Sequence, residues 1–285
     1  MAAPQTTSMF KQADFVRRYK LAEKLTGLFA RPLINQTAIA SYSKNPIILE
    51  NACGTGAISS ALHQTLPDQV KQSWKLTCGD FSDAMIEVTK QRAADEGWQN
   101  AEVKNVDAQD TKLPSDYYSH VLTAFAIPML PDNDAALKEC LRILQPGGTY
   151  ASTNWKTTPQ IAIMLSSLEA LTPELPLPDA EQFQKNIRKD WDDEAVIKSA
   201  LENIGFTEVK VTPVTDKVSF PIAEFVEMNK SFTPAFLGRF WTKEQQEQHA
   251  GRVPDVMQEW LEKKFGVDGV VTLEPTVMVV TAKKP

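Results

Sequence analysis

The chain has 285 residues, which is enough for one large domain or two small ones. Hydrophobic residues make up 42% of it and charged residues 23%, a composition that indicates a globular protein and excludes a disordered or fibrous one. The formal net charge of −6, without a local cluster of Lys and Arg, excludes the cationic surface that a nucleic-acid-binding protein needs.

The first residues, 1–8, are polar and lack the apolar core of a signal peptide. No later stretch is apolar over the length that is needed to cross a bilayer. We therefore expect a cytoplasmic protein without a membrane partner, and the sequence leaves its oligomeric state open. Three widely spaced cysteines suggest neither a disulfide framework nor a metal site, and we expect them to be small buried residues: Cys53, Cys78 and Cys140.

In chain order, residues 8–42 are predicted to be helical, and short β-branched runs begin to alternate with longer helical patterns at Pro46. This alternation is typical of βαβ units, which build a parallel sheet. Strands are expected at 47–51, 75–80, 101–106, 120–125, 149–154, 208–214 and 270–282. Helices are expected at 56–66, 82–96, 132–144, 159–171 and 193–204.

The alternation is interrupted twice after Trp155. Residues 156–192 contain one helix candidate and a Pro-rich stretch, whereas residues 219–266 are irregular and rich in aromatic side chains. Together with residues 8–42, these segments are interpreted as helical lid pieces that are added to one core. The sequence therefore predicts a single α/β domain over residues 1–285, with its core at 45–155.

A glycine turn follows the first predicted strand. The apolar run 47–49 leads to Glu50 and then to Gly54 and Gly56, after which a helical pattern starts. Glycine lets a ligand approach the main chain closely, and a helix N-terminus offers amide donors to a carboxylate. Glu50 can lie near a positively charged amine. Because many ordinary turns contain glycine, this loop alone is weak evidence for a nucleotide-like ligand.

Two further carboxylates follow neighbouring strands. Asp80 ends the second strand and can accept hydrogen bonds from both hydroxyls of a ribose, while Asp107 and Ala108 after the third can read the edge of an adenine. Open α/β sheets bind ligands at this carboxyl edge. As alternatives, Asp80 could cap the next helix, and Asp107 could be a solvated turn residue. Phe81 and Met85 fit equally well as core residues or as walls of an adenine pocket.

Four stretches, 49–56, 79–85, 106–110 and 142–148, resemble successive motifs of the class I S-adenosylmethionine-dependent methyltransferases. The resemblance implies a Rossmann-like, seven-stranded, mostly parallel sheet with helices on both faces, which binds S-adenosylmethionine and releases S-adenosylhomocysteine without a metal. The implied cofactor contacts are Glu50, Asn51, Ala52, Gly54 and Gly56 around the methionine part, Asp80 at the ribose, Phe81, Met85, Asp107 and Ala108 at the adenine, and Phe125 near the transferred methyl. One residue departs from the pattern, since His120 stands where the family often has Asp.

The residues around these motifs are similar to methyltransferases of fungal natural-product pathways, in particular the gliotoxin bis-thiomethyltransferase group. The stretches 51–53 and 97–98 carry much of this similarity. It implies that the acceptor is a small hydrophobic natural product, with a thiol sulfur as the first expectation and an oxygen or nitrogen as the alternative.

Methyl transfer from a sulfonium is an in-line displacement, so orientation of the acceptor is the main task and no dedicated catalytic residue is required. A thiol with a pKa near ~8.5 is already partly ionised at neutral pH, whereas a phenol near ~10 gains more from a base. The chain has only three histidines. His63 and His120 are expected to be structural, and His249 is a weak candidate for a base. This scarcity favours a soft nucleophile.

Aromatic residues of the second insert could line the acceptor pocket or simply pack, because Phe232 and Phe236 recur at helical spacing. We expect packing for most of them. If the inserts lie over the carboxyl ends of the strands, some should line an apolar pocket. The pocket candidates are Tyr19, Trp155, Phe232, Phe236 and Trp241.

Two other functions remain open at this point. A nicotinamide-dependent oxidoreductase could use the same kind of sheet, but the third small position of its glycine fingerprint is Ser59 here, and no catalytic Tyr and Lys pair occurs at helical spacing. A non-catalytic protein could keep the fold and the cofactor without an acceptor. Turnover with any acceptor would exclude this possibility.

Overall fold

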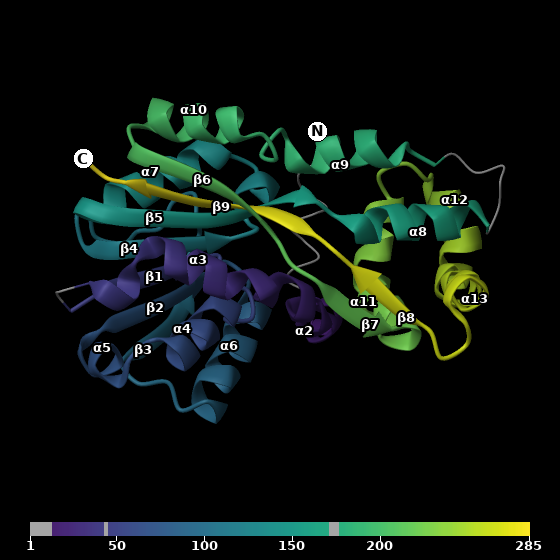
Figure 1. The fold of residues 1–285 in the computed structure, drawn as a ribbon, viewed down its shortest axis with the longest axis horizontal. Coiled ribbons are helices and arrows are strands. Elements are labelled where there is room, and N and C mark those ends of the chain that lie inside the picture. Colours follow the sequence, from purple (N-terminus) through teal and green to yellow (C-terminus); the bar gives the residue numbers. More distant parts are fainter. Residues whose placement is uncertain (1–12, 43–44, 171–176) are drawn as a thin grey trace.

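The computed structural model describes residues 13–42, 45–170 and 177–285, and at its centre lies a seven-stranded sheet (Figure 1). The strand order is β3-β2-β1-β4-β5-β9-β6. Neighbouring strands from β3 to β5 are parallel, and only β9 runs antiparallel to its neighbours β5 and β6. The strands are β1 (Ile47–Asn51), β2 (Lys75–Asp80), β3 (Ala101–Asn105), β4 (Tyr118–Ala124), β5 (Leu144–Thr157), β6 (Thr207–Thr215) and β9 (Thr276–Lys283). The predicted α/β class is confirmed.

Helices cover both faces of the sheet, and β1 shows how the sequence arranges this. Ile48 packs in the cluster of α3 (Ala30–Thr37) and α4 (Ala57–Thr65), whereas Leu49 packs in the cluster of α7 (Asn133–Ile143) and α10 (Glu194–Ile204). Both residues are fully buried. A strand that is covered on both faces must be apolar at successive positions, which explains the continuous apolar run. Helices α5 (Asp68–Ser73) and α6 (Asp83–Asp95) complete the first half of the sheet.

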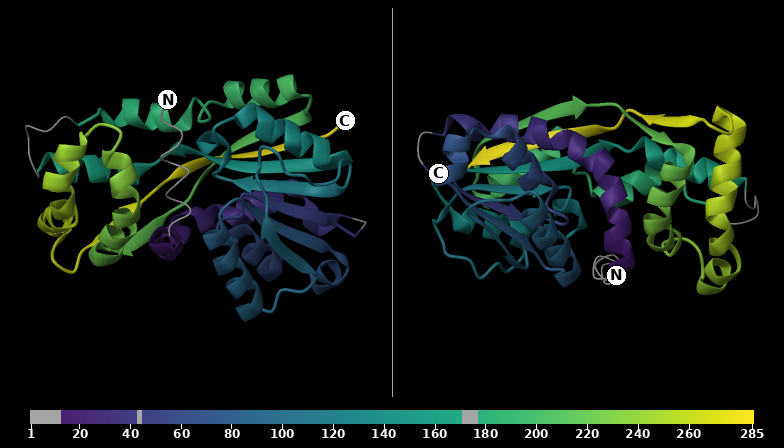
Figure 2. Two further views of the ribbon diagram at one scale, coloured as in Figure 1. Left: turned by 180° about the vertical axis from the view of Figure 1, so that it is seen from behind. Right: turned by 90° about the horizontal axis from the view of Figure 1, so that it is seen from below.

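The two inserts and the first helix form a second hydrophobic cluster beside the sheet, which we call the lid (Figure 2). The strand β5 leads directly into it, so the lid lies at the carboxyl edge of the parallel strands. The lid consists of α2 (Ala13–Thr26), α8 (Pro159–Glu169), α9 (Ala180–Arg188), α11 (Ile222–Leu237), α12 (Lys243–His249), α13 (Val253–Phe265) and the two-stranded antiparallel sheet of β7 (Val218–Pro221) and β8 (Val270–Leu273). Segments that are far apart in the sequence thus share one core.

The strand ends differ from the prediction in three places. The expected strand at 270–282 is two strands, because β8 pairs with β7 in the lid and Pro275, which has no amide donor, precedes β9. Strand β7 was not predicted and lies partly in the segment expected to be helical. Strand β5 begins at Leu144 and continues to Thr157, so it is much longer than the expected 149–154. Its antiparallel pairing with β9 supports the extension.

Helices α7 and α10 begin where the sequence predicts, because the residue expected to start each of them is its N-cap. Asp132 and Asp193 cap α7 and α10 through their side chains, and Gly205 ends α10 in a left-handed conformation. Helix α5 was not predicted. Residues 8–12 and 171–176, which the sequence assigns to the lid segments, lie outside the described residues.

Within the described ranges, no helix is both long enough and apolar enough to span a membrane.

Candidate active site

The glycine loop joins β1 to α4, as the sequence predicts. Ala52, Gly54 and Gly56 have left-handed backbones, with φ of 56°, 55° and 75°, and Gly56 is the N-cap residue of α4. A Cβ atom at Gly56 would lie 2.9 Å from Cγ2 of Thr89 and 3.0 Å from Cη2 of Trp98. This position therefore requires glycine both for its conformation and for the space that α6 and the following turn leave.

Asp80, the last residue of the neighbouring strand β2, is hydrogen-bonded to the loop. It is 5% exposed, and its Oδ2 accepts a hydrogen bond from the amide of Gly54 at 2.8 Å while its Oδ1 accepts one from Ser82 at 2.9 Å. Burial raises the pKa of this carboxyl, and the amide bonds oppose the shift. The cap of α6 is Ser82, whose hydroxyl accepts from the amide of Met85. Asp80 is thus tied to the loop, and its oxygens keep lone pairs for further donors.

Glu50 lies beneath the loop and is 2% exposed. Its oxygens accept hydrogen bonds from the amides of Ile58 at 3.3 Å and Ser59 at 2.9 Å, and from the hydroxyl of Ser59. Burial raises the pKa of Glu50 to about 7, although these bonds and the charge of Arg92 lower it. Because Glu50 is buried beneath the loop and already accepts hydrogen bonds from α4, it can act on a cation at the loop mainly through its charge.

The expected adenine side lies at the ends of β2 and β3. Asp107 is exposed and accepts a hydrogen bond from the amide of Gln109 at 2.9 Å. This geometry also agrees with the alternative interpretation, in which Asp107 is a solvated turn residue. Ala108 is 5% exposed and Met85 is 1% exposed. Met85 packs against Val16 of α2, so it is a core residue that borders the site. Phe81 is half-buried.

Helix α2 covers the glycine loop. A Cβ atom at Gly54 would lie 3.8 Å from Cε1 of Tyr19, and burial together with nearby carboxylate charges raises the pKa of Tyr19 to about 12. One turn later, Glu23 forms an ion pair with Arg92 of α6 at 2.7 Å. The same guanidinium donates to the carbonyl of Thr55 in the loop at 2.8 Å. One arginine thus connects α2, the loop and α6.

Three aromatic side chains lie together at the ends of β4 and β5. Phe125 has a φ of 58°, and its ring stacks on Trp155 with 4.3 Å between the centroids. Phe29 meets both rings edge on, at 6.3 Å and 6.0 Å. A left-handed backbone is rare outside glycine, and such strain tends to gather at functional sites. These rings form a largely buried apolar cluster at the point where the resemblance expects methyl transfer.

The other pocket candidates divide between two places. Phe232 meets the ring of Tyr19 edge on at 6.3 Å, next to the loop. Phe236 packs on Phe183 with 4.2 Å between the centroids, and Trp241 is 4% exposed in the same lid cluster. The structure therefore brings Tyr19 and Phe232 together, whereas Phe236 and Trp241 support the core of the lid.

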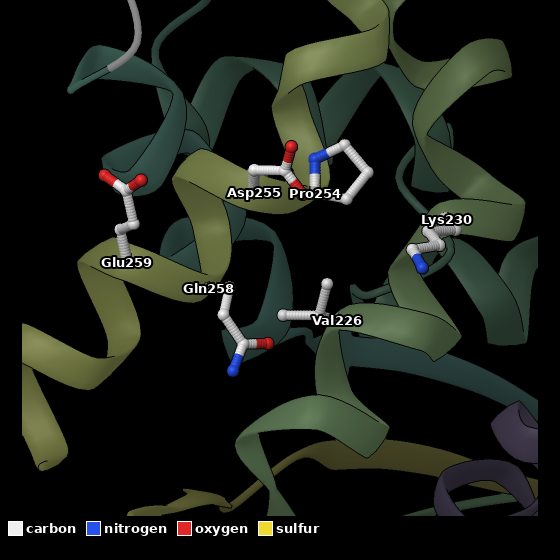
Figure 3. Close-up of a pocket in the computed structure, with 6 residues that line it drawn as sticks. All are labelled: Val226, Lys230, Pro254, Asp255, Gln258 and Glu259. Carbon is white, nitrogen blue, oxygen red and sulfur yellow. The ribbon is translucent and has the colours of Figure 1, made fainter. Parts of the chain in front are cut away.

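Two open hollows lie away from the glycine loop. One, of about 380 Å³ between α11 and α13, is lined by Val226, Lys230, Pro254, Asp255, Gln258 and Glu259 (Figure 3). The other, of about 510 Å³, is lined by Lys156, Lys185, Asp190, Asp192, Asp193, Glu194, Pro213 and Met278. Charged side chains make up half of the lining of the first hollow and most of that of the second, so neither has the apolar lining expected of the acceptor pocket.

The three histidines are not placed to act as a base at the loop. His63 stacks on Trp98 with 4.9 Å between the centroids, and one ring nitrogen lies 2.9 Å from the carbonyl of Ser59. His120 is 2% exposed within β4, and burial lowers its pKa to about 3. His249 ends α12, on the side of the lid that is far from β1 (Figure 1). His120 pairs in register with β1 and β5, so its departure from the family pattern leaves β4 in place.

Some residues of the site carry no sequence signal that we recognised. Thr89 donates from its hydroxyl to the carbonyl of Gly54 at 2.7 Å, and Arg92 and Phe29 also contact the site from distant parts of the chain. In contrast, the side chain of the predicted Asn51 faces α7, where its Nδ2 donates to Sγ of Cys140 at 3.7 Å. Only the main chain of Asn51 belongs to the loop. All three cysteines are free and buried, as expected.

Comparison with known proteins identifies the class of enzyme. A family described as "Methyltransferase domain" matches residues 48–148, which include the glycine loop and both carboxylates that follow β2 and β3. The chain is also 43% identical over 278 residues to the methyltransferase tpcH of Aspergillus fumigatus, which covers 97% of this chain and 99% of that protein. The chain belongs to the S-adenosylmethionine-dependent methyltransferases. The predicted resemblance is confirmed.

A second fungal relative and two solved structures agree with this assignment. The methyltransferase is 42% identical over 286 residues to acetylaranotin bis-thiomethyltransferase of Aspergillus terreus, with 100% of both chains covered. Phosphoethanolamine N-methyltransferase 2 of Haemonchus contortus, in complex with phosphomonomethylethanolamine and S-adenosylhomocysteine, matches with a TM-score of 0.56 at 14% identity, covering 97% of this chain and 60% of that one. A putative methyltransferase of Bacillus halodurans matches with a TM-score of 0.54 at 15% identity, covering 89% and 98%. These two structures show the fold.

Proposed function

We propose that this enzyme binds S-adenosylmethionine at the glycine loop and methylates a thiol sulfur of a small hydrophobic natural product, releasing S-adenosylhomocysteine. The observation that carries the proposal is the bond from the amide of Gly54 to the carboxylate of Asp80. This bond joins the loop after β1 and the carboxylate after β2 into one cradle. Such a cradle at the carboxyl edge of a parallel sheet suits a nucleoside with a charged tail.

The residues of this cradle fit the parts of the cofactor. Gly54 and Gly56 let the main chain approach the methionine part closely, while the buried charge of Glu50 favours an ammonium above it. We expect Asp80 to accept hydrogen bonds from the ribose hydroxyls, and Asp107 and Ala108 to bind the adenine. When bound, the cofactor supplies an electrophilic methyl that a nucleophile takes in line. Phe125 and Trp155 would hold the acceptor and exclude water at this point.

Sulfur is the acceptor atom that the supporting observations favour. The relative from Aspergillus terreus is named a bis-thiomethyltransferase. A thiol also requires the least help from a base, since its pKa of ~8.5 leaves a fraction ionised at neutral pH. Tyr19, which lies against the loop, has a pKa of about 12 and therefore remains protonated. The described histidines lie in structural positions. Orientation and water exclusion then supply most of the acceleration.

A matched set of acceptors tests this proposal. We expect 4-methylbenzenethiol to be methylated at least about 100-fold faster than 4-methylphenol, because only the thiol is substantially ionised without a base. The amine 4-methylaniline attacks without ionisation, so it tests nitrogen as the acceptor atom independently of any base. Mass spectrometry of the products, with labelled S-adenosylmethionine, measures all three rates. Preferential methylation of the phenol or the amine would show that sulfur is not the acceptor atom.

A further inference from the structure

Glu23 of α2 has a carboxylate oxygen that the mechanism above does not use. Its Oε2 is paired with Nη2 of Arg92 at 2.7 Å, and the side chain is 12% exposed. Its Oε1 is buried, and among the described residues this atom has no hydrogen-bond partner. A buried polar atom costs free energy when it stays unpaired, and the cost is larger for a charged group. This oxygen therefore calls for a donor from a ligand or from water.

The contacts of its neighbours place Glu23 beside the glycine loop. Glu23 lies one helical turn after Tyr19, so both residues share the face of α2 that covers the loop. Burial raises the pKa of Tyr19, and the charges of Glu23 and Asp80 add to the shift, so both carboxylates lie near this ring. Arg92, which holds Glu23, also donates to the carbonyl of Thr55 in the loop at 2.8 Å. The unpaired oxygen thus belongs to the interface between α2 and the loop.

The charges around the loop favour a cation at this oxygen. Three carboxylates lie there, those of Glu23, Glu50 and Asp80, whereas the guanidinium of Arg92 supplies one positive charge. Glu50 lies beneath the loop and is bonded to α4, so it acts mainly through its charge. Glu23 lies on the helix that covers the loop and keeps an acceptor for a direct bond. A primary ammonium, which has three N–H donors and a full charge, matches this acceptor best.

We propose that Glu23 is a cofactor-binding residue, whose Oε1 accepts a hydrogen bond from the α-ammonium of the methionine part of the cofactor. Helix α2 then completes the cofactor site as well as covering it, and Arg92 is the positioning residue that orients the carboxylate. Because a charge-assisted hydrogen bond is stronger than a neutral one, binding of the cofactor also fastens α2 to the loop. The inference rests on the proposed binding of S-adenosylmethionine at the glycine loop.

Two ligands that differ only in the amino group test this role by titration calorimetry. S-adenosylhomocysteine has the group, and 5′-S-(3-carboxypropyl)-5′-thioadenosine is the same molecule without it. We expect Glu23→Gln to weaken binding of S-adenosylhomocysteine at least about tenfold and binding of the deamino ligand less than about twofold. Glu96→Gln is the matched control and should weaken neither ligand more than about twofold. Glu96 also pairs with Arg92, at 3.1 Å, but its second oxygen is already bonded to Ser60 and Trp98.

Hydrogen exchange of the wild type provides a second readout, which does not depend on the folding of Glu23→Gln. At saturation, S-adenosylhomocysteine should slow exchange of the α2 amides at least about fivefold more than the deamino ligand does. Equal protection of α2 by both ligands would overturn the role of Glu23, as would a Glu23→Gln variant whose affinity for both ligands is unchanged or equally reduced. Failure of the wild type to bind either ligand would instead contradict the proposed cofactor site itself, and the inference with it.

Discussion

At the scale of single residues, Glu50 controls the charge beneath the glycine loop. Its pKa of about 7 means that about half of the free enzyme carries a neutral Glu50 at pH 7. A bound ammonium favours the ionised form, so binding of S-adenosylmethionine releases a proton below this pH. Cofactor affinity should therefore increase about fivefold from pH 6 to pH 7 and level off above pH 8, as measured by titration calorimetry.

The variant Glu50→Gln provides the control for this pH dependence. It keeps the size of the side chain but cannot ionise, so its cofactor affinity should be lower at pH 8 and should vary little between pH 6 and pH 8. A wild-type affinity that is equally constant over this range would show that Glu50 does not act through its charge.

The sequence reveals the residues of the site that follow strands, and it misses those that reach the loop from helices. Glu50 and Asp80 are found because each ends an apolar run beside a turn. Arg92 is missed because its partners, Thr55 and Glu23, lie far away in the chain. In the sequence, Arg92 lies among polar residues of the kind found on any solvent-exposed helix face. Three-dimensional packing alone distinguishes it from a surface arginine.

At the scale of elements, the turn from β1 into α4 depends on the lack of a side chain at Gly56. The variant Gly56→Ala should lower the free energy of unfolding by about 2–4 kcal/mol, from left-handed strain and from the clash with Thr89 and Trp98. Gly97→Ala is the matched control, since Gly97 is also left-handed but has open space around it. It should cost only about 1 kcal/mol. Equal losses in urea denaturation would refute the crowding argument.

The attachment of α2 to α6 depends on a partly buried ion pair. Glu23→Gln should destabilise the enzyme by about 2 kcal/mol, because Arg92 loses a charged partner where the two side chains are only 12% and 17% exposed. The neighbouring pair of Lys24 and Glu224 is more exposed, at 42% and 30%. Lys24→Met should therefore cost at most about 0.5 kcal/mol. Thermal unfolding of both variants measures the difference, and a larger loss for Lys24→Met would contradict this account of α2.

Element boundaries were predictable where a local chemical signal marks them. Asp132, Asp193 and Gly205 define helix ends through caps that the sequence shows directly. The two-stranded sheet of β7 and β8 was missed because each strand has only four residues and its partner lies about 50 residues away. Short strands with distant partners carry little periodicity, so only their pairing in the lid fixes them.

At the scale of the whole molecule, the lid lies at the carboxyl edge of the sheet, where the glycine loop is formed. Its cluster combines side chains from both inserts and from α2. The sequence predicts that the inserts cover this edge, because β5 must lead into the first of them. It does not show that Phe236 and Trp241 pack within the lid while Tyr19 reaches the loop. That division depends on which face each helix presents to its neighbours.

Binding of S-adenosylmethionine to wild-type enzyme and to Asp80→Ala, measured by titration calorimetry, tests the central claim most directly. We expect saturable binding by the wild type and at least tenfold weaker binding by Asp80→Ala, because the carboxylate anchors Gly54 and, in the proposed site, accepts hydrogen bonds from the ribose. Asp83→Ala, which removes an exposed carboxylate from the first turn of α6, should bind like the wild type. Absence of binding to the wild type, or unchanged affinity in Asp80→Ala, would contradict the proposed cofactor site.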